Sequence, residues 1–109
     1  MMDDMELQTQ FESVKTEIAQ KRARNEDVST LLRTQAALLR EGYDKILAAT
    51  SGEEFDQNPR KYSTLLSYIN SMRSILIELN DPADEVDALE NNVKEQMNKN
   101  GLGWLLEQL

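Results

Sequence analysis

Hydrophobic residues recur along the chain at helical spacing and predict four helices. The stretches of about 3–23, 27–50, 59–80 and 82–99 place apolar residues three or four positions apart, on one face of a helix. No run of alternating apolar and polar residues is long enough to indicate a strand. The sequence therefore predicts an all-α fold.

The second and third of these helices carry the broadest apolar faces. They have similar lengths, and the polar stretch 51–58 that joins them breaks the helical pattern. We therefore expect an antiparallel long helical hairpin of about 27–50 and 59–80, flanked by an N-terminal and a C-terminal helix in a single helical domain, 1–109. Gly42 is interpreted as a point of close packing against a neighbouring helix rather than a hinge. A lone four-helix bundle and hairpins of several copies packed side by side would both cover the apolar faces.

Residues that commonly begin helices precede three of the predicted segments. Asn58 and Pro59 are predicted as the N-cap and first residue of the third helix. Asn25 or Asp27 is expected to cap the second helix, and Asp81 the fourth.

A short segment follows the fourth helix. Residues 101–109 contain two glycines and the only tryptophan of the chain. They are typical of a flexible docking tail that lays an apolar face into a partner's groove, and equally of a segment that folds back over its own bundle. The residues predicted for partner docking are Trp104, Leu105, Leu106 and Leu109.

The charge is strongly negative and unevenly distributed. The net charge is -8, from 12 basic and 20 acidic residues. Residues 1–20 carry -4 and residues 75–109 carry -6, whereas residues 21–74 carry +2. DNA-binding proteins usually present a clustered basic face. The nearest approach to such a face in this sequence is the group of basic residues between positions 21 and 33, and the favoured interpretation of this group is a solvated helix surface. The weak candidates for DNA binding are Lys21, Arg22, Arg24 and Arg33.

The composition argues against an enzyme. The chain has no histidine and no cysteine, which excludes an imidazole base, a thiolate nucleophile and metal ligands of either kind. It has no phosphate-binding glycine loop, and the acids Glu53, Glu54 and Asp56 do not match a calcium-binding loop. We therefore expect no catalytic residues, no cofactor and no metal.

Three central stretches form a recognisable combination: LLRTQAALLREGYDKILAAT, a polar connection with NPRKY, and STLLSYINSMRSILIELN. Together they resemble the central hairpin of terminase small subunits from tailed phages, most nearly the T-even type. The matching positions are 46–50, Pro59-Arg60 and 62–79.

The resemblance implies a phage DNA-packaging component. Terminase small subunits assemble into a ring-like homo-oligomer through these hairpins, engage viral DNA and regulate the large terminase subunit, an ATPase-nuclease. The resemblance also makes the segment around Trp104 a candidate contact to the large subunit. The residues that it implies for the oligomer interface are Leu39, Ile46, Tyr62, Leu66, Ile69, Met72 and Leu76.

One departure from the family pattern concerns DNA. Many members carry an N-terminal helix-turn-helix, whereas residues 1–25 are predicted to form one acidic helix. That departure argues against direct sequence-specific DNA binding.

Two other functional classes stay open. The net charge is compatible with a small acidic helical inhibitor or adaptor, of the anti-defence or DNA-mimic type, that binds a basic protein partner. The other open class is a plain coiled-coil assembly or chaperone module.

Residues 1–10 lack the features of a targeting signal, and no apolar run is long enough for a membrane span. The expected location is therefore the cytoplasm of the host cell, without a membrane partner.

Overall fold

The computed structural model describes residues 3–108, and among them it contains helices and no strand. The all-α prediction, with its long hairpin flanked by a helix at each end, is confirmed. The elements are α1 (Asp4–Ala23), α2 (Ser29–Ala49), α3 (Glu53–Asp56), α4 (Pro59–Leu79), α5 (Asp84–Lys99) and the 3-10 helix η1 (Gly103–Gln108).

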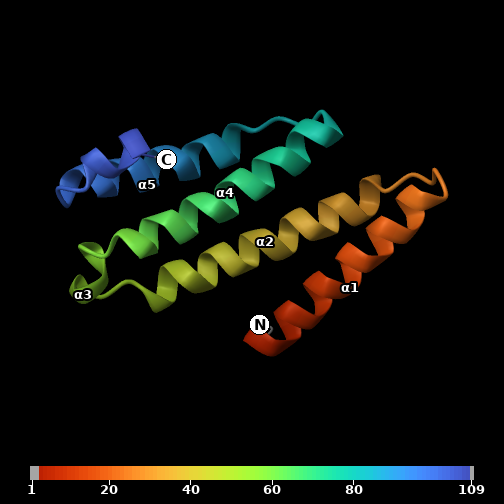
Figure 1. Cartoon of the computed structure of the whole chain (residues 1–109), viewed down its shortest axis with the longest axis horizontal. Coiled ribbons are helices and arrows are strands. Elements are labelled where there is room, and N and C mark those ends of the chain that lie inside the picture. Colours follow the sequence, from red (N-terminus) through yellow and green to blue (C-terminus); the bar gives the residue numbers. More distant parts are fainter. Residues whose placement is uncertain (1–2, 109) are drawn as a thin grey trace.

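The four long helices lie side by side in chain order, each antiparallel to the one before (Figure 1). The most extensive contact is between α2 and α4, while α1 packs mainly on α2 and α5 mainly on α4. The molecule measures 48 × 29 × 21 Å. Because the array does not close into a bundle, α1 and α5 are each covered chiefly on one side.

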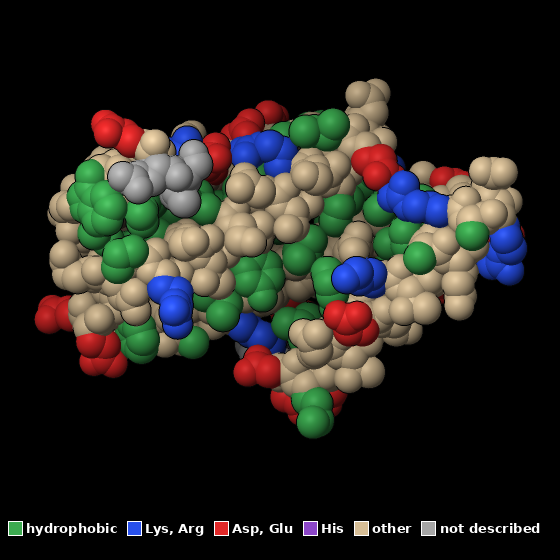
Figure 2. Space-filling view, viewed as in Figure 1, with side chains coloured by type: hydrophobic (Ala, Val, Ile, Leu, Met, Phe, Trp, Pro, Cys, Tyr) green, Lys and Arg blue, Asp and Glu red, His purple; other side chains and the backbone are tan. Residues whose placement is uncertain are grey.

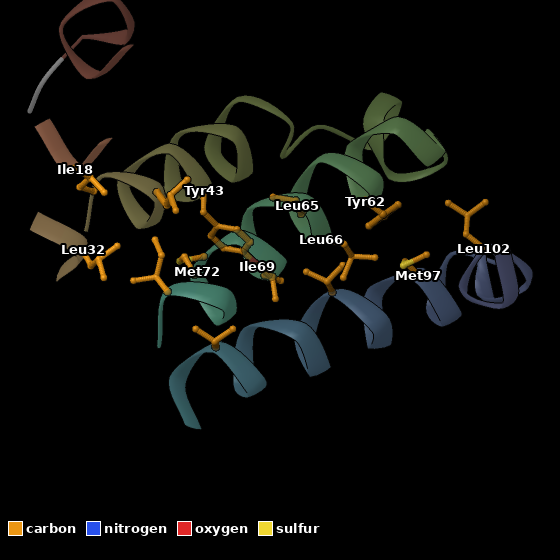
Figure 3. Close-up of a cluster of buried hydrophobic side chains, with 14 residues drawn as sticks. Ile18, Leu32, Tyr43, Tyr62, Leu65, Leu66, Ile69, Met72, Met97 and Leu102 are labelled. Atoms are coloured by element: carbon orange, nitrogen blue, oxygen red, sulfur yellow. The ribbon is translucent and has the colours of Figure 1, made fainter. Parts of the chain in front are cut away.

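The core runs along the hairpin and onto α5. Its largest fully buried side chains are Tyr43, Tyr62, Leu65, Ile69 and Met97. Figure 3 shows Ile18 and Leu32 at one end of this cluster and Tyr62, Met97 and Leu102 at the other. Each fully buried aliphatic side chain of this size stabilises the fold by about 1.5–3 kcal/mol.

The start of α4 agrees with the prediction. The Asn58 side chain accepts a hydrogen bond from the Arg60 N–H at 3.0 Å, and Pro59 is the first helical residue. At the start of α2 the prediction is wrong, because the N-cap is Val28. Asp27 nevertheless binds the first turn, since its carboxylate accepts from the Ser29 N–H at 3.0 Å.

The predicted start of the fourth helix is also wrong. α5 begins at Asp84 with Ala83 as its N-cap. Asp81 instead completes the turn that ends α4, where Asn80 adopts a left-handed backbone with φ 58°. The Asp81 N–H then reaches back to the Leu76 carbonyl at 2.9 Å, a hydrogen bond typical of a Schellman motif.

The connection at 51–58 is a break in the hairpin, as predicted, yet it contains the one-turn helix α3. It is attached to the core by Tyr62, whose hydroxyl donates to the Asp56 carbonyl at 2.8 Å. The same hydroxyl accepts from the Asn100 side-chain amide at 3.1 Å, so α3, α4 and the end of α5 meet at one buried phenol.

Candidate functional site

A groove with a volume of about 310 Å³ lies between α1, α2 and α4. Hydrophobic side chains gather in the hollow between α1 and the rest of the molecule (Figure 2). The groove exists because α1 diverges from the hairpin toward its N-terminus (Figure 1), which leaves the faces of Leu7 and Phe11 only partly covered. We call it the α1 groove; its apolar lining is Leu7, Phe11, Leu38, Leu39, Gly42, Ile46 and Tyr68.

Gly42 and Tyr68 shape the floor of the α1 groove. A β-carbon at position 42 would lie 2.8 Å from Cε1 of Tyr68, closer than van der Waals contact allows. The Tyr68 ring therefore lies directly against the α2 backbone. This confirms the prediction of close packing at Gly42.

The edge of the α1 groove is polar. Asp4, Gln8 and Glu12 follow one another along α1, and Lys45 lies on the α2 side. The Lys45 ammonium is 3.4 Å from the Asp4 carboxylate, with the lysine side chain 20% exposed and the aspartate 94% exposed. Acids therefore outnumber the one lysine among the residues that line the α1 groove.

Most residues predicted for the oligomer interface lie inside the chain's own core. Leu39, Tyr62, Leu66, Ile69 and Met72 are all buried by neighbouring helices of the same chain. In this fold they present little surface to a second copy.

The remaining two interface residues are half-buried and line grooves. Ile46 lines the α1 groove, and Leu76 lines a second groove of about 300 Å³ between α2, α4 and α5. Their role in assembly stays a prediction.

Three of the four residues predicted for DNA binding are paired with acids. The Arg22 guanidinium donates to both carboxylate oxygens of Glu78, at 2.7 and 2.9 Å. Arg24 lies 2.9 Å from Glu26.

The third pair joins Arg33 to Asp81 at 3.5 Å. The fourth residue, Lys21, lies near Asp27, whose pKa is lowered by hydrogen bonds from Ser29 and further by the charges of Arg33 and Lys21. Four basic side chains are therefore interspersed with four acids, and the region does not form a basic face.

The C-terminal segment folds back only in part. Leu102 is buried, and Leu105 and Leu106 pack against the core. Trp104 points away and is 54% exposed. Leu109, the fourth residue predicted for docking, lies outside the described residues.

The α1 groove has no signal of its own in the sequence, because its lining comes from three helices. The helical spacing of apolar residues over about 3–23 predicts a packing face on α1, but not how far that face stays uncovered. Gly42 was the one local signal for a close approach at this site.

Within residues 3–108, no group of three or more acidic side chains is arranged to hold a metal ion. None of the described helices combines the length and apolar character that crossing a bilayer requires. Comparisons with protein-family models, with curated proteins and with solved structures found no match for this chain.

Proposed function

We propose that this chain is a non-enzymatic component of phage DNA packaging: a terminase small subunit that assembles into a ring and regulates the large terminase subunit. The observation that supports the proposal is the α2–α4 hairpin, formed by the same stretches that resemble the family's central hairpin. The apolar surfaces left outside the hairpin core, above all the α1 groove, would supply contacts between copies.

The proposal assigns no DNA contact to Lys21, Arg22, Arg24 and Arg33. Their carboxylate neighbours cancel the local positive charge on which phosphate binding depends. Engagement of the genome would then pass through the large subunit.

Light scattering and native mass spectrometry test the ring. A multiple of 12.5 kDa corresponding to a ring is expected at micromolar concentration. A chain that stays monomeric there would overturn the proposal. Regulation is tested by adding the chain to a large terminase subunit encoded in the same genome and measuring ATP hydrolysis, which is expected to change.

An acidic inhibitor or adaptor is the second candidate. Glu6, Glu12 and Glu17 on α1 are exposed and form no ion pair among the described residues, so α1 presents negative charge to a basic partner. On this alternative the chain would displace duplex DNA from a basic DNA-binding domain at low salt, measured by anisotropy of labelled DNA. The effect would weaken as salt rises.

A further inference from the structure

The chain contains one Asn-Gly pair, Asn100-Gly101, where α5 ends. Asparagine before glycine is chemically labile, because glycine has no β-carbon to keep its backbone nitrogen away from the preceding carboxamide. Every other asparagine of the chain precedes a residue with a side chain. By sequence, Asn100 is therefore the asparagine most prone to lose its amide group.

The fold holds both reacting groups of this pair. The Asn100 side-chain amide donates to the Gln96 carbonyl at 2.9 Å, one turn back along α5, and to the Tyr62 hydroxyl at 3.1 Å. The Gly101 N–H donates to the Asn98 carbonyl at 3.2 Å. The side-chain nitrogen that would leave and the backbone nitrogen that would attack are thus each engaged elsewhere.

These contacts belong to a turn that the core keeps in place. Asn100 caps the end of α5, and Gly101 follows with φ 77°. The Leu102 N–H donates to the Met97 carbonyl at 2.7 Å, which completes a Schellman motif. Leu102 and Met97 are buried in the same cluster as Tyr62 (Figure 3). For the Gly101 nitrogen to reach the Asn100 carboxamide, this turn must open first.

We propose that Asn100-Gly101 is a latent deamidation site, which the turn at the end of α5 keeps in the amide form. In the opened turn, the Gly101 nitrogen gives up its proton and attacks Cγ of Asn100. A C–N bond forms, and the side-chain nitrogen leaves with that proton as ammonia. Water then opens the cyclic imide at either carbonyl, which leaves an aspartate or an isoaspartate. This site is independent of the self-assembly proposed above.

Deamidation would convert a transient opening into a lasting loss of stability. A carboxylate at position 100 cannot donate to the Gln96 carbonyl or to the Tyr62 hydroxyl. The proton of the Tyr62 hydroxyl is already donated to the Asp56 carbonyl. An isoaspartate also lengthens the backbone by a methylene group inside the turn. Both products therefore remove the hydrogen bonds that join the end of α5 to α4.

Peptide mapping by mass spectrometry measures the reaction. The full chain is incubated at mildly alkaline pH with and without urea, and conversion is followed as the gain in mass when the amide becomes a carboxyl group. Conversion at Asn100 should be at least about tenfold faster in urea, where the turn is open. Asn70, which precedes a serine, should react more slowly than Asn100 in urea. An Asn100 that keeps its amide in urea would overturn the site, and equal rates with and without urea would overturn its protection by the fold.

Tyr62→Phe tests the protection. It removes one acceptor of the Asn100 amide and should raise the conversion rate without urea roughly tenfold, while the rate in urea stays the same. Tyr68→Phe is the matched control, because Tyr68 makes no hydrogen bond to Asn100. If Tyr62→Phe converts no faster than Tyr68→Phe, the Tyr62 hydroxyl does not protect the amide.

Gly101→Ala tests the attacking atom. A β-carbon at position 101 hinders the approach of the backbone nitrogen, so conversion of Asn100 in urea should slow down. The comparison is made in urea and does not depend on whether the variant folds. Conversion as fast as in the wild type would show that the reaction does not pass through the Gly101 nitrogen.

Asn100→Asp reproduces one product and tests the lasting effect. It should lower the urea concentration at which the chain unfolds. The matched control is Asn98→Asp, which places the same charge in the last turn of α5 and has the same unfavourable sign for the helix dipole, but on an exposed side chain. Equal unfolding midpoints of the two variants would contradict a loss of stability specific to Asn100.

Discussion

The two ends of the helical array are held together by different interactions. At the end with α3, which we call the tyrosine end, Tyr62 and Met97 are almost fully buried and the Tyr62 hydroxyl is bonded to Asp56 and Asn100. At the opposite end, the ion-pair end, Arg22–Glu78 and Arg33–Asp81 connect the helices.

The ion pairs at the ion-pair end are exposed to water. In the Arg22–Glu78 pair both side chains are nearly half exposed, at 49% and 44%. Water and salt screen such pairs, and each contributes little to stability. Burial of large apolar side chains contributes several times more. Substitutions of the buried side chains at the tyrosine end should therefore change the free energy of unfolding more than substitutions of the exposed ion pairs, although the ion-pair end also buries Ile18 and Leu32.

The largest expected effect is at the tyrosine end. Met97→Ala should lower the free energy of unfolding by about 2–5 kcal/mol, because the side chain is fully buried and its removal leaves a cavity. Urea unfolding followed by circular dichroism measures the change. Ile77→Ala serves as the exposed control, with an expected change within about 0.5 kcal/mol. Equal effects of the two substitutions would contradict the assigned burial.

Tyr62→Phe removes only the hydroxyl from the tyrosine end. The Asp56 carbonyl and the Asn100 amide then lose a partner near the core, at an expected cost of about 1–3 kcal/mol. Tyr68→Phe is the matched control, since Tyr68 is half-buried and its hydroxyl has no such pair of hydrogen-bond partners among the described residues. If both variants unfold at the same urea concentration, the buried hydrogen bonds do not hold α3 in place.

The hairpin could be predicted because its signals are local. Repeated three–four spacing defines both helices, and Asn58 with Pro59 defines where α4 begins. The start of α5 could not be placed, because the backbone of Asn80 decides whether Asp81 caps the next helix or ends the previous one. A left-handed asparagine and a helix-capping aspartate are both common in such sequences.

The candidate site was harder to predict because it depends on how helices diverge. Leu39 and Ile46 belong to one apolar face of α2 in the sequence and both line the α1 groove, yet Leu39 is buried and Ile46 is only half-buried. The direction in which α1 leaves the hairpin decides how far each side chain is covered. The neutralisation of the basic residues was hard to predict for a similar reason. Arg22 lies close to Lys21 and Arg24 in the sequence, but the acid that pairs with Arg22 is Glu78, which belongs to α4.

A smaller effect is expected at the ion-pair end. A double-mutant cycle with Arg22→Ala and Glu78→Ala should give a coupling energy below about 1 kcal/mol, because the pair is exposed. Raising the salt concentration should reduce that coupling further. A coupling that matches the loss for Tyr62→Phe would contradict the difference between the two ends.

The smallest effect concerns Asp27, also at the ion-pair end, and it depends on pH. Hydrogen bonds from the Ser29 hydroxyl and N–H lower the pKa of Asp27 in the folded chain below its ordinary value. A carboxyl group with a lowered folded pKa stabilises the fold above its unfolded pKa of about 3.9, and the contribution disappears as pH falls through the folded pKa. Asp27→Asn should therefore reduce stability at pH 7 and converge with the wild type in acid. Ser29→Ala removes one donor and should raise the Asp27 pKa in a carboxyl NMR titration; an unchanged pKa would mean that Ser29 does not hold this carboxylate.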